Sequence, residues 1–161
     1  MPYSSLVMHE DESRLIIEII EKLLADSNAI SVYLVDKDGQ LLASSGDTRD
    51  IDSTSLASLT AGNIAATGGL ARLIGEKEFS ILFHEGEKEN LHISIINQRV
   101  ILVIIFDDRS SLGLVRLRVK RAGAELQQGI RKVVGRMESS ESAEETLLDE
   151  ISDEDIENLF K

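Results

Sequence analysis

The sequence predicts an α+β fold in which helices pack against one five-stranded sheet, an α/β sandwich. Three stretches carry apolar residues at helical spacing, and five short runs are rich in the β-branched residues that strands favour. Along the chain these segments follow the order helix, two strands, helix, three strands, helix. The 161 residues are 42% hydrophobic, which suits one domain with a single core.

The first half of the chain predicts a helix followed by a hairpin. The helix is expected over 10–27, where isoleucines and leucines recur at helical spacing, and Asn28 is a suitable stop. A strand is expected over 30–36 and a second one near 40–45. The Asp38-Gly39 pair between them is a strong signal for the tight turn of a β-hairpin.

A second helix is predicted over 53–75, with Asp52 or Ser53 as its N-cap. Its larger apolar residues lie on one broad side: Leu56, Leu59, Leu70, Leu73 and Ile74. Its small residues fall on another side, which Arg72 continues: Ala57, Ala61, Ala65 and Gly68. Each glycine inside a helix costs about 0.8–1 kcal/mol relative to alanine, so the small size must bring a benefit. We favour a partner-binding or self-association face; the alternative is that the small residues let the helix lie flat on its own sheet.

Three further strands are expected over 79–84, 90–96 and 99–106. The last of these is apolar on both faces, which predicts a central strand that is covered on both sides. Alternate residues of 90–96 face opposite ways, and we expect His92 to face solvent or to make one hydrogen bond. Asn97-Gln98 predicts a tight turn between the second and third of these strands.

The third helix is predicted over 111–137, where helical periodicity is clearest. Basic residues dominate its neighbourhood, and Glu125 is the only acid among them: Arg109, Arg116, Arg118, Lys120, Arg121, Arg131, Lys132 and Arg136. Aromatic residues make up only 4% of the chain and none lies among these bases, which argues against a nucleic-acid site. We interpret this face as solvated, or as facing acidic residues of the body, the tail or a partner.

The rest of the chain is predicted to lie outside the domain of residues 6–137. Residues 138–150 are rich in serine and glutamate and are expected to form an acidic flexible linker. Residues 151–161 are expected to form a short C-terminal partner-binding helix, whose apolar residues are Ile151, Ile156, Leu159 and Phe160. So short a helix is not stable alone in water, so we expect it to dock on a partner. Packing on its own body and persistent disorder are the alternatives.

The formal net charge is −12, and most of it lies in the tail. Residues 138–161 hold ten acids and one base, whereas the remainder is nearly balanced. This charge disfavours wrapping of nucleic acid. No apolar run approaches the roughly 20 residues of a membrane helix, and no secretory signal is evident, so we expect a cytoplasmic protein without membrane association. The absence of cysteine excludes disulfides and thiolate metal sites.

Motifs that carry enzymatic chemistry are missing from the sequence. It contains no phosphate-binding P-loop, no dinucleotide-binding fingerprint and no nucleophile elbow. His84-Glu85 begins like a zinc-protease motif, but Lys88 stands where the second histidine would be required. Asp107-Asp108 precedes the third helix, and we interpret it as a cap of that helix rather than a metal site. We therefore expect no catalytic residues, no cofactor and no metal.

Four runs of sequence carry a resemblance to a known family: SLASLTAGNIAATGGLARLIGE at 55–76, FHEG at 83–86, FDDRSSLGLVRLR at 106–118 and EISDEDIENLF at 150–160. With the order of elements and the small-residue second helix, they resemble the roadblock/LC7 family. The similarity is closest to its bacterial members that act as GTPase-activating proteins for a small Ras-like GTPase. It extends over residues 6–135 and the tail segment, and it is weak over 138–150.

The resemblance implies a homodimer whose sheets join across a two-fold axis, with the second helices side by side as a platform. Two protomers would then engage one MglA-like GTPase in its GTP-bound state. On this sequence the platform is 53–75, and its implied contact residues are Ala61, Ala65, Gly68 and Arg72. The tail helix is implied to contact the GTPase through the four apolar residues named above.

The resemblance also implies a mechanism. Such proteins reshape the GTPase so that its own arginine and glutamine reach the nucleotide, and this sequence has no arginine on an evident glycine-rich protruding loop. An arginine inserted in trans, which would be Arg72, is the alternative. The implied role is control of front–rear polarity and gliding motility in a bacterium, with enrichment at a cell pole.

Two other functions stay open at this stage. A non-catalytic roadblock scaffold would bind a GTPase or another polarity protein without changing the hydrolysis rate. A nucleic-acid-binding dimer would use the basic helix. The scaffold shares its fold and surface with the activator, so the sequence barely separates these two.

Overall fold

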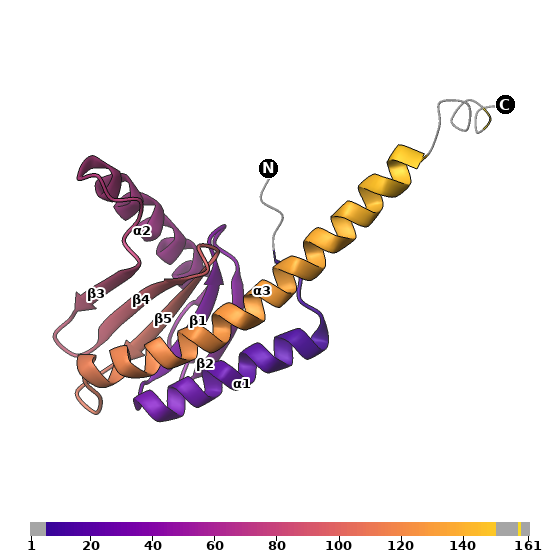
Figure 1. Cartoon of the computed structure of the whole chain (residues 1–161). Helices are drawn as coiled ribbons and strands as arrows, with labels where there is room; N and C mark the ends of the chain where they lie inside the picture. Colours follow the sequence, from indigo (N-terminus) through magenta and orange to yellow (C-terminus); the bar gives the residue numbers. More distant parts are fainter. Residues whose placement is uncertain (1–5, 151–157, 159–161) are drawn as a thin grey trace.

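The computed structural model describes residues 6–150 and Asn158. Its helices and strands are α1 (Glu10–Ser27), β1 (Ser31–Asp36), β2 (Leu41–Gly46), α2 (Ser53–Leu73), β3 (Ile81–Glu85), β4 (Asn90–Ile96), β5 (Val100–Phe106) and α3 (Leu112–Glu150). This order confirms the predicted sequence of elements. Figure 1 shows α1 and α3 together on one face of the sheet, with α2 on the other.

One antiparallel sheet holds all five strands in the order β2-β1-β5-β4-β3. The middle strand is β5, and every one of its residues is buried, which confirms the prediction of a central strand covered on both sides. Val103 of this strand lies opposite Tyr33 of β1 and Ile93 of β4. The sheet therefore ends in β2 on one side and in β3 on the other.

The two faces of the sheet have separate apolar cores. Beneath α1 and α3 lies the larger core, which includes Ile16, Ile20, Leu34, Leu102, Ile104, Leu126 and Ile130. Beneath α2 lies a smaller one, which includes Tyr33, Val35, Ala57, Ile64, Ile93, Ile101 and Val103. Alternate residues of the same strands serve both cores, as the two-residue period of a strand requires. The α2 face is thus covered by a single helix.

The predicted turns form, and left-handed backbone conformations make them possible. Asn28 ends α1 with φ 54°. Asn97 and Gln98 have φ values of 54° and 57°, and positive φ at both central residues is the signature of a type I′ hairpin turn. Gly39 has φ 95° in the turn between β1 and β2, a conformation that glycine adopts without steric cost because it has no side chain.

Helix α3 continues to Glu150, so the prediction of a flexible linker over 138–150 is wrong in its secondary structure. No glycine or proline interrupts this stretch, and glutamate, alanine and leucine are good helix formers. Residues 138–145 are exposed. We call residues 138–150 the arm; at 1.5 Å per residue it is about 20 Å long, and in Figure 1 it projects beyond the body.

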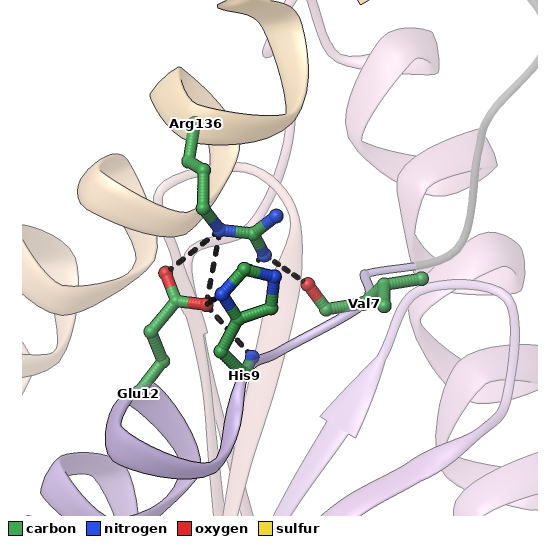
Figure 2. Close-up of polar contacts among 4 residues, drawn as sticks. All are labelled: Val7, His9, Glu12 and Arg136. Carbon is green, nitrogen blue, oxygen red and sulfur yellow. Dashed lines mark hydrogen bonds and ion pairs between the residues drawn. The ribbon is translucent and has the colours of Figure 1, made fainter. Parts of the chain in front are cut away.

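A cluster of polar contacts fastens α3 where it leaves the body (Figure 2). The Arg136 guanidinium donates to both carboxylate oxygens of Glu12, over 3.1 and 3.3 Å from Nε, and to the carbonyl oxygen of Val7 over 2.5 Å from Nη2. The backbone amide of His9 donates to Glu12 Oε1 over 2.8 Å at the start of α1. Arg136 therefore joins the N-terminal segment, α1 and α3. We call this set the clasp.

His92 is buried, and our prediction that it faces solvent or makes one hydrogen bond is wrong. The residue is 1% exposed on β4, on the sheet face that carries the larger core. Neither ring nitrogen has a hydrogen-bond partner among the described residues. The alternation of β4 was read correctly, but α3 covers the face on which the sequence suggested solvent.

Asp107 does not cap α3, contrary to our interpretation. Its carboxylate accepts hydrogen bonds from the backbone amide of Arg109 over 3.0 Å and from Arg109 Nε over 3.1 Å, within the loop itself. The Ser111 hydroxyl oxygen accepts from the amide of Leu114 over 3.1 Å and caps the helix instead. Because Arg109 binds it, the pKa of Asp107 lies below its ordinary value.

Candidate partner-binding surface

Helix α2 presents an exposed surface that is apolar and almost without charge. Arg72 is the only charged residue in its 21 residues. Four large apolar side chains, Leu59, Leu70, Leu73 and Ile74, at or just beyond the end of α2, are between 59% and 82% exposed. Interface cores are depleted in charged residues, and contiguous exposed apolar patches mark interaction sites. The outer side of α2 is therefore the leading candidate for a binding surface.

The start of α2 is held by a side-chain cap. The Asp52 carboxylate accepts hydrogen bonds from the backbone amide and the hydroxyl of Ser55, over 3.2 and 2.8 Å. These bonds stabilise the charged form and lower the pKa of Asp52. This contact confirms Asp52 as one of the two predicted caps. The helix buries Ala57, Thr60, Ile64 and Ala71 against the sheet, which turns its opposite side outwards.

The four predicted contact residues of α2 lie along one flank of the helix. Ala65 and Arg72 are exposed, whereas Ala61 and Gly68 are half-buried. Ala61 faces the β1–β2 turn, because its Cβ lies 3.8 Å from the point where a side chain on Gly39 would begin. Arg72 Nη1 lies 3.8 Å from the corresponding point on Gly68, so the guanidinium lies back along the helix.

The packing interpretation of the small residues holds in part, whereas the partner-binding interpretation stays a prediction. Ala57 is fully buried and lets α2 lie on its own sheet. Ala65 is free on the surface, together with Arg72. The structure brings the predicted flank together as one strip, but the chain's own hairpin covers part of it.

Sequence reasoning did not assign the exposed leucines to the surface. The sequence of this helix shows two apolar sides at helical spacing. One side holds Leu59, Leu70 and Leu73, and the other holds the small residues. A helix on the face of one sheet buries one side only, so two apolar sides already indicate that one of them stays exposed. That argument could have selected the leucines as well as the small residues.

Strand β3 adds an uncovered sheet edge to this surface. Among the described residues its one strand partner is β4, and edge strands expose unpaired backbone groups that can accept another strand. Ile81 is 49% exposed and Phe83 is 38% exposed, although the Phe83 ring stacks on Phe106 with centroids 6.1 Å apart. Asn63 Nδ2 of α2 donates to His84 Nε2 over 3.1 Å, which joins α2 to this strand.

We call the exposed side of α2, together with the edge of β3 that the Asn63–His84 contact joins to it, the α2–β3 surface (Figure 1). The Ile81 and Phe83 side chains lie on the other face of the sheet, since these residues stand opposite Ser94 and His92 and the Phe83 ring stacks on Phe106. The other predicted contact residues, Ile151, Ile156, Leu159 and Phe160, lie outside the described residues. Their role stays a prediction.

Within the described ranges, 6–150 and Asn158, no group of histidine, aspartate or glutamate side chains is arranged to hold a metal ion. The same part of the chain has no helix that is both long and apolar enough to cross a membrane.

Comparison with known proteins places these features in a family. The Roadblock/LC7 domain model matches residues 15–106, which is more than half of the chain. The chain belongs to the roadblock/LC7 family. This membership confirms the predicted fold, including the single five-stranded sheet and the helix α3 that follows it. The short helix predicted over 151–161 lies outside the described residues.

Within the family, the chain is similar to solved structures of MglB. Myxococcus xanthus MglB is 56% identical, with 80% of this chain and 96% of that chain covered and a TM-score of 0.76. The gliding protein MglB from Thermus thermophilus is 32% identical, with coverages of 81% and 98% and a TM-score of 0.76. A structure described as MglB with a tetrameric arrangement is 31% identical, with the same coverages and a TM-score of 0.77. A search of curated proteins found no match.

Proposed function

We propose that this roadblock/LC7 protein is a homodimeric GTPase-activating protein for a small Ras-like GTPase of the MglA type. The observation that carries the proposal is the 56% identity to Myxococcus xanthus MglB over 80% of the chain. So high an identity over so much of the chain extends beyond core positions, which are a minority of residues. We therefore expect the two proteins to share a binding surface as well as a fold.

The dimer would form through the edge of β3. A second copy that adds its own β3 in antiparallel orientation would satisfy the unpaired backbone groups of both strands. The two sheets would then continue into each other, and the two α2 helices would lie on the same face. The exposure of Ile81 and Phe83 supports this arrangement, since a neighbouring strand would cover part of both side chains.

The paired α2 helices would form the platform for the GTPase. A single globular partner that sits on the two-fold axis touches both copies of α2, which gives two protomers per GTPase. The lack of charge on α2 and the exposed Ala65 support close contact there, and Arg72 would lie at the edge of the contact. The tail helix would add a second contact through its apolar residues.

Acceleration would come from selection of a GTPase conformation. A dimer that binds the catalytically aligned, GTP-bound state better than other states shifts the population toward it. An arginine inserted in trans would supply a factor of about 10³–10⁵ by itself. The position of Arg72, which lies back along its own helix toward Gly68, supports the first mechanism.

Polarity and motility are the proposed cellular setting. The Thermus relative is described as a gliding protein, and this chain is 32% identical to it over the 81% of the chain that the match covers. We propose that the protein acts in the cytoplasm, enriched at one cell pole, as a regulator without a catalytic site of its own.

Single-turnover GTP hydrolysis by the MglA-like GTPase of the same organism tests the proposal. The GTPase is loaded with GTP, and the rate is measured alone and with increasing amounts of this protein. We expect acceleration that saturates. Binding without acceleration would contradict the activator and leave the roadblock scaffold, while neither effect would remove both.

A further inference from the structure

Strand β3 leaves two large apolar side chains partly uncovered on the face of the sheet that α1 and α3 occupy. Ile81 and Phe83 stand opposite Ser94 and His92 of β4, and they are 49% and 38% exposed. On this face α1 packs over β1 and β2, and α3 packs over β4. The two helices therefore stop short of the outermost strand, although the Phe83 ring still stacks on Phe106.

The flank of α3 that faces β3 is basic. A Cβ on Gly123 would lie 3.3 Å from Ile96 Cδ1 of β4. The positive charge of Arg116 acts on the same strand, where it helps to lower the pKa of His92. Lys120 follows Arg116 by one helical turn, and both are exposed without an ion pair in the described part of the chain. We call Arg116, Lys120 and Gly123 the inner flank of α3.

The proposed β3-edge dimer would set two such regions side by side. Neighbouring strands lie about 4.8 Å apart, so the two β4 strands would lie about 14 Å apart and the two β5 strands about 24 Å apart. Each α3 lies over β4 and β5 (Figure 1). Packed helices need about 8–10 Å between their axes, so a third helix fits between two that are about 16–20 Å apart. The dimer therefore leaves room for one helix above the exposed side chains of β3.

We propose that this part of the dimer binds an amphipathic helix with acidic flanks from a further protein partner; the inference rests on the proposed dimer. Ile81 and Phe83 of both copies would form an apolar floor, and Arg116 and Lys120 would form a basic wall on each side. The floor and walls match the apolar stripe and the acidic flanks of such a helix. Glu85, the one acid of β3, follows in the same row at the end of the strand, so the acids of the partner are expected along the walls.

A helix suits this site better than an extended strand. An extended strand binds by adding to a free sheet edge, and the two β3 edges would already pair with each other. A helix binds through its side chains, because its backbone groups are paired within the helix. The site lies on the opposite face of the sheet from α2, so the GTPase and this partner can bind the same dimer at once (Figure 1).

Binding of a synthetic acidic helix tests the proposal. The probe is a peptide of about 18 residues, with leucines along one face and glutamates beside them. The control peptide has the same composition, with its leucines spread around the helix. Fluorescence anisotropy of each labelled peptide with the full chain measures the affinity. We expect one probe per dimer and binding of the control that is at least about tenfold weaker. Equal affinities for the two peptides would overturn the proposal.

Charge reversal locates the site. Arg116→Glu with Lys120→Glu should weaken binding of the probe by at least about tenfold, and should leave the mass of the dimer and its effect on GTP hydrolysis unchanged. Arg131→Glu with Lys132→Glu is the matched control, since it makes the same change of charge at exposed positions further along α3. This control should bind the probe like the wild type. Unchanged binding in the first variant, or an equal loss in both, would contradict the proposal; thermal unfolding confirms that each variant is folded.

Further outcomes separate this inference from the proposed function. Sedimentation velocity of the chain alone establishes whether the dimer forms. A dimer that does not bind the probe overturns this inference and leaves the proposed dimer standing, whereas a monomer removes both. Displacement of the probe by the GTP-bound GTPase would place the probe on α2 and contradict the site. Tighter binding of the probe after deletion of residues 151–161 would show that this acidic segment of the chain, rather than another protein, is the occupant.

Discussion

His92 is a titratable residue held without a charge partner in the larger core. Burial penalises its charged form and lowers the pKa of His92 from the ordinary value of 6.5, and the positive charge of Arg116 acts in the same direction. Above pH 6.5 the imidazole is neutral in both the folded and the unfolded chain, so it does not make stability depend on pH. Below that pH the unfolded chain binds a proton that the folded chain resists.

We therefore expect the free energy of unfolding to fall as the pH drops below 6.5, by up to about 1.4 kcal/mol per pH unit from this residue. His92→Leu removes the titration and should flatten the fall. Urea unfolding of the wild type and of His92→Leu between about pH 7.5 and pH 5 measures how the free energy of unfolding depends on pH. Equal slopes in the two proteins would show that His92 is not the group responsible.

Gly46, at the end of β2, is a position that no other residue fits. Its φ is +93°, and a Cβ there would lie 2.4 Å from the carbonyl oxygen of Ile30 and 2.9 Å from Leu24 Cδ1. Gly46→Ala should lower the free energy of unfolding by about 3 kcal/mol, because the backbone must shift. Gly69→Ala in α2 is the matched control: nothing lies within 4 Å of its Cβ position, and stability should rise by up to about 1 kcal/mol. Denaturant unfolding measures both, and a neutral Gly46→Ala would refute the steric argument.

At the scale of elements, local patterns were enough to predict which segments become helices and strands. The spacing of isoleucines in α1, the Asp38-Gly39 turn and the apolar run of β5 each act over a few residues, so no knowledge of the tertiary structure was needed. Burial is different, because it depends on what covers a face. This is why the burial of His92 beneath α3 was not predicted. For the same reason the predicted contact surface of α2 included only its small residues and Arg72.

The predicted end of α3 was wrong for a different reason. The apolar stripe that marks a packed helix ends at Met137, and the prediction ended with it. Beyond that point α3 continues as a helix whose residues 138–145 are exposed. The helical conformation of this stretch follows from intrinsic helix propensity rather than from an apolar face, and propensity alone is a weak signal in a serine-rich stretch.

The flank of α2 can be tested by adding bulk and charge where the chain has room. Ala65→Arg with Gly68→Arg should abolish GTPase binding while dimer and fold survive. Ala65 is exposed, and a Cβ on Gly68 meets only the flexible end of Arg72, 3.8 Å away. Isothermal titration with the GTP-bound GTPase measures the binding, and sedimentation checks the dimer.

Ala65→Ser with Gly68→Ala keeps both positions small and serves as the control, with binding expected close to that of the wild type. If the arginine variant also binds normally, this flank of α2 is not the platform.

The C-terminal segment, residues 151–161, has a proposed role that can be tested. Deletion of these residues should leave the thermal unfolding temperature unchanged and weaken GTPase binding by about tenfold, since one of the two proposed contacts is lost. The arm is retained, so the charge pattern of the described part of α3 is unaffected. A clear drop in the unfolding temperature would show instead that the tail packs on its own body.

At the scale of the whole molecule, the two faces of the sheet carry different kinds of surface. The α2 face is covered by one helix and leaves a surface with Arg72 as the only charge of that helix, beside the edge strand β3, which suits the proposed dimer and GTPase contacts. On the other face α1 and α3 leave β3 partly uncovered beside the basic inner flank of α3. The sequence predicted the first surface through its resemblance to a family. The second needed the packing of α3 over β4, which only the structure supplied.

We propose that two protomers act together on one GTPase through α2. Titration of single-turnover GTP hydrolysis at a fixed, high GTPase concentration tests this stoichiometry. We expect the rate to rise linearly and to saturate at two protomers per GTPase, with the double arginine variant of α2 inactive at every ratio. Saturation at one protomer per GTPase, or full acceleration by that variant, would contradict the claim.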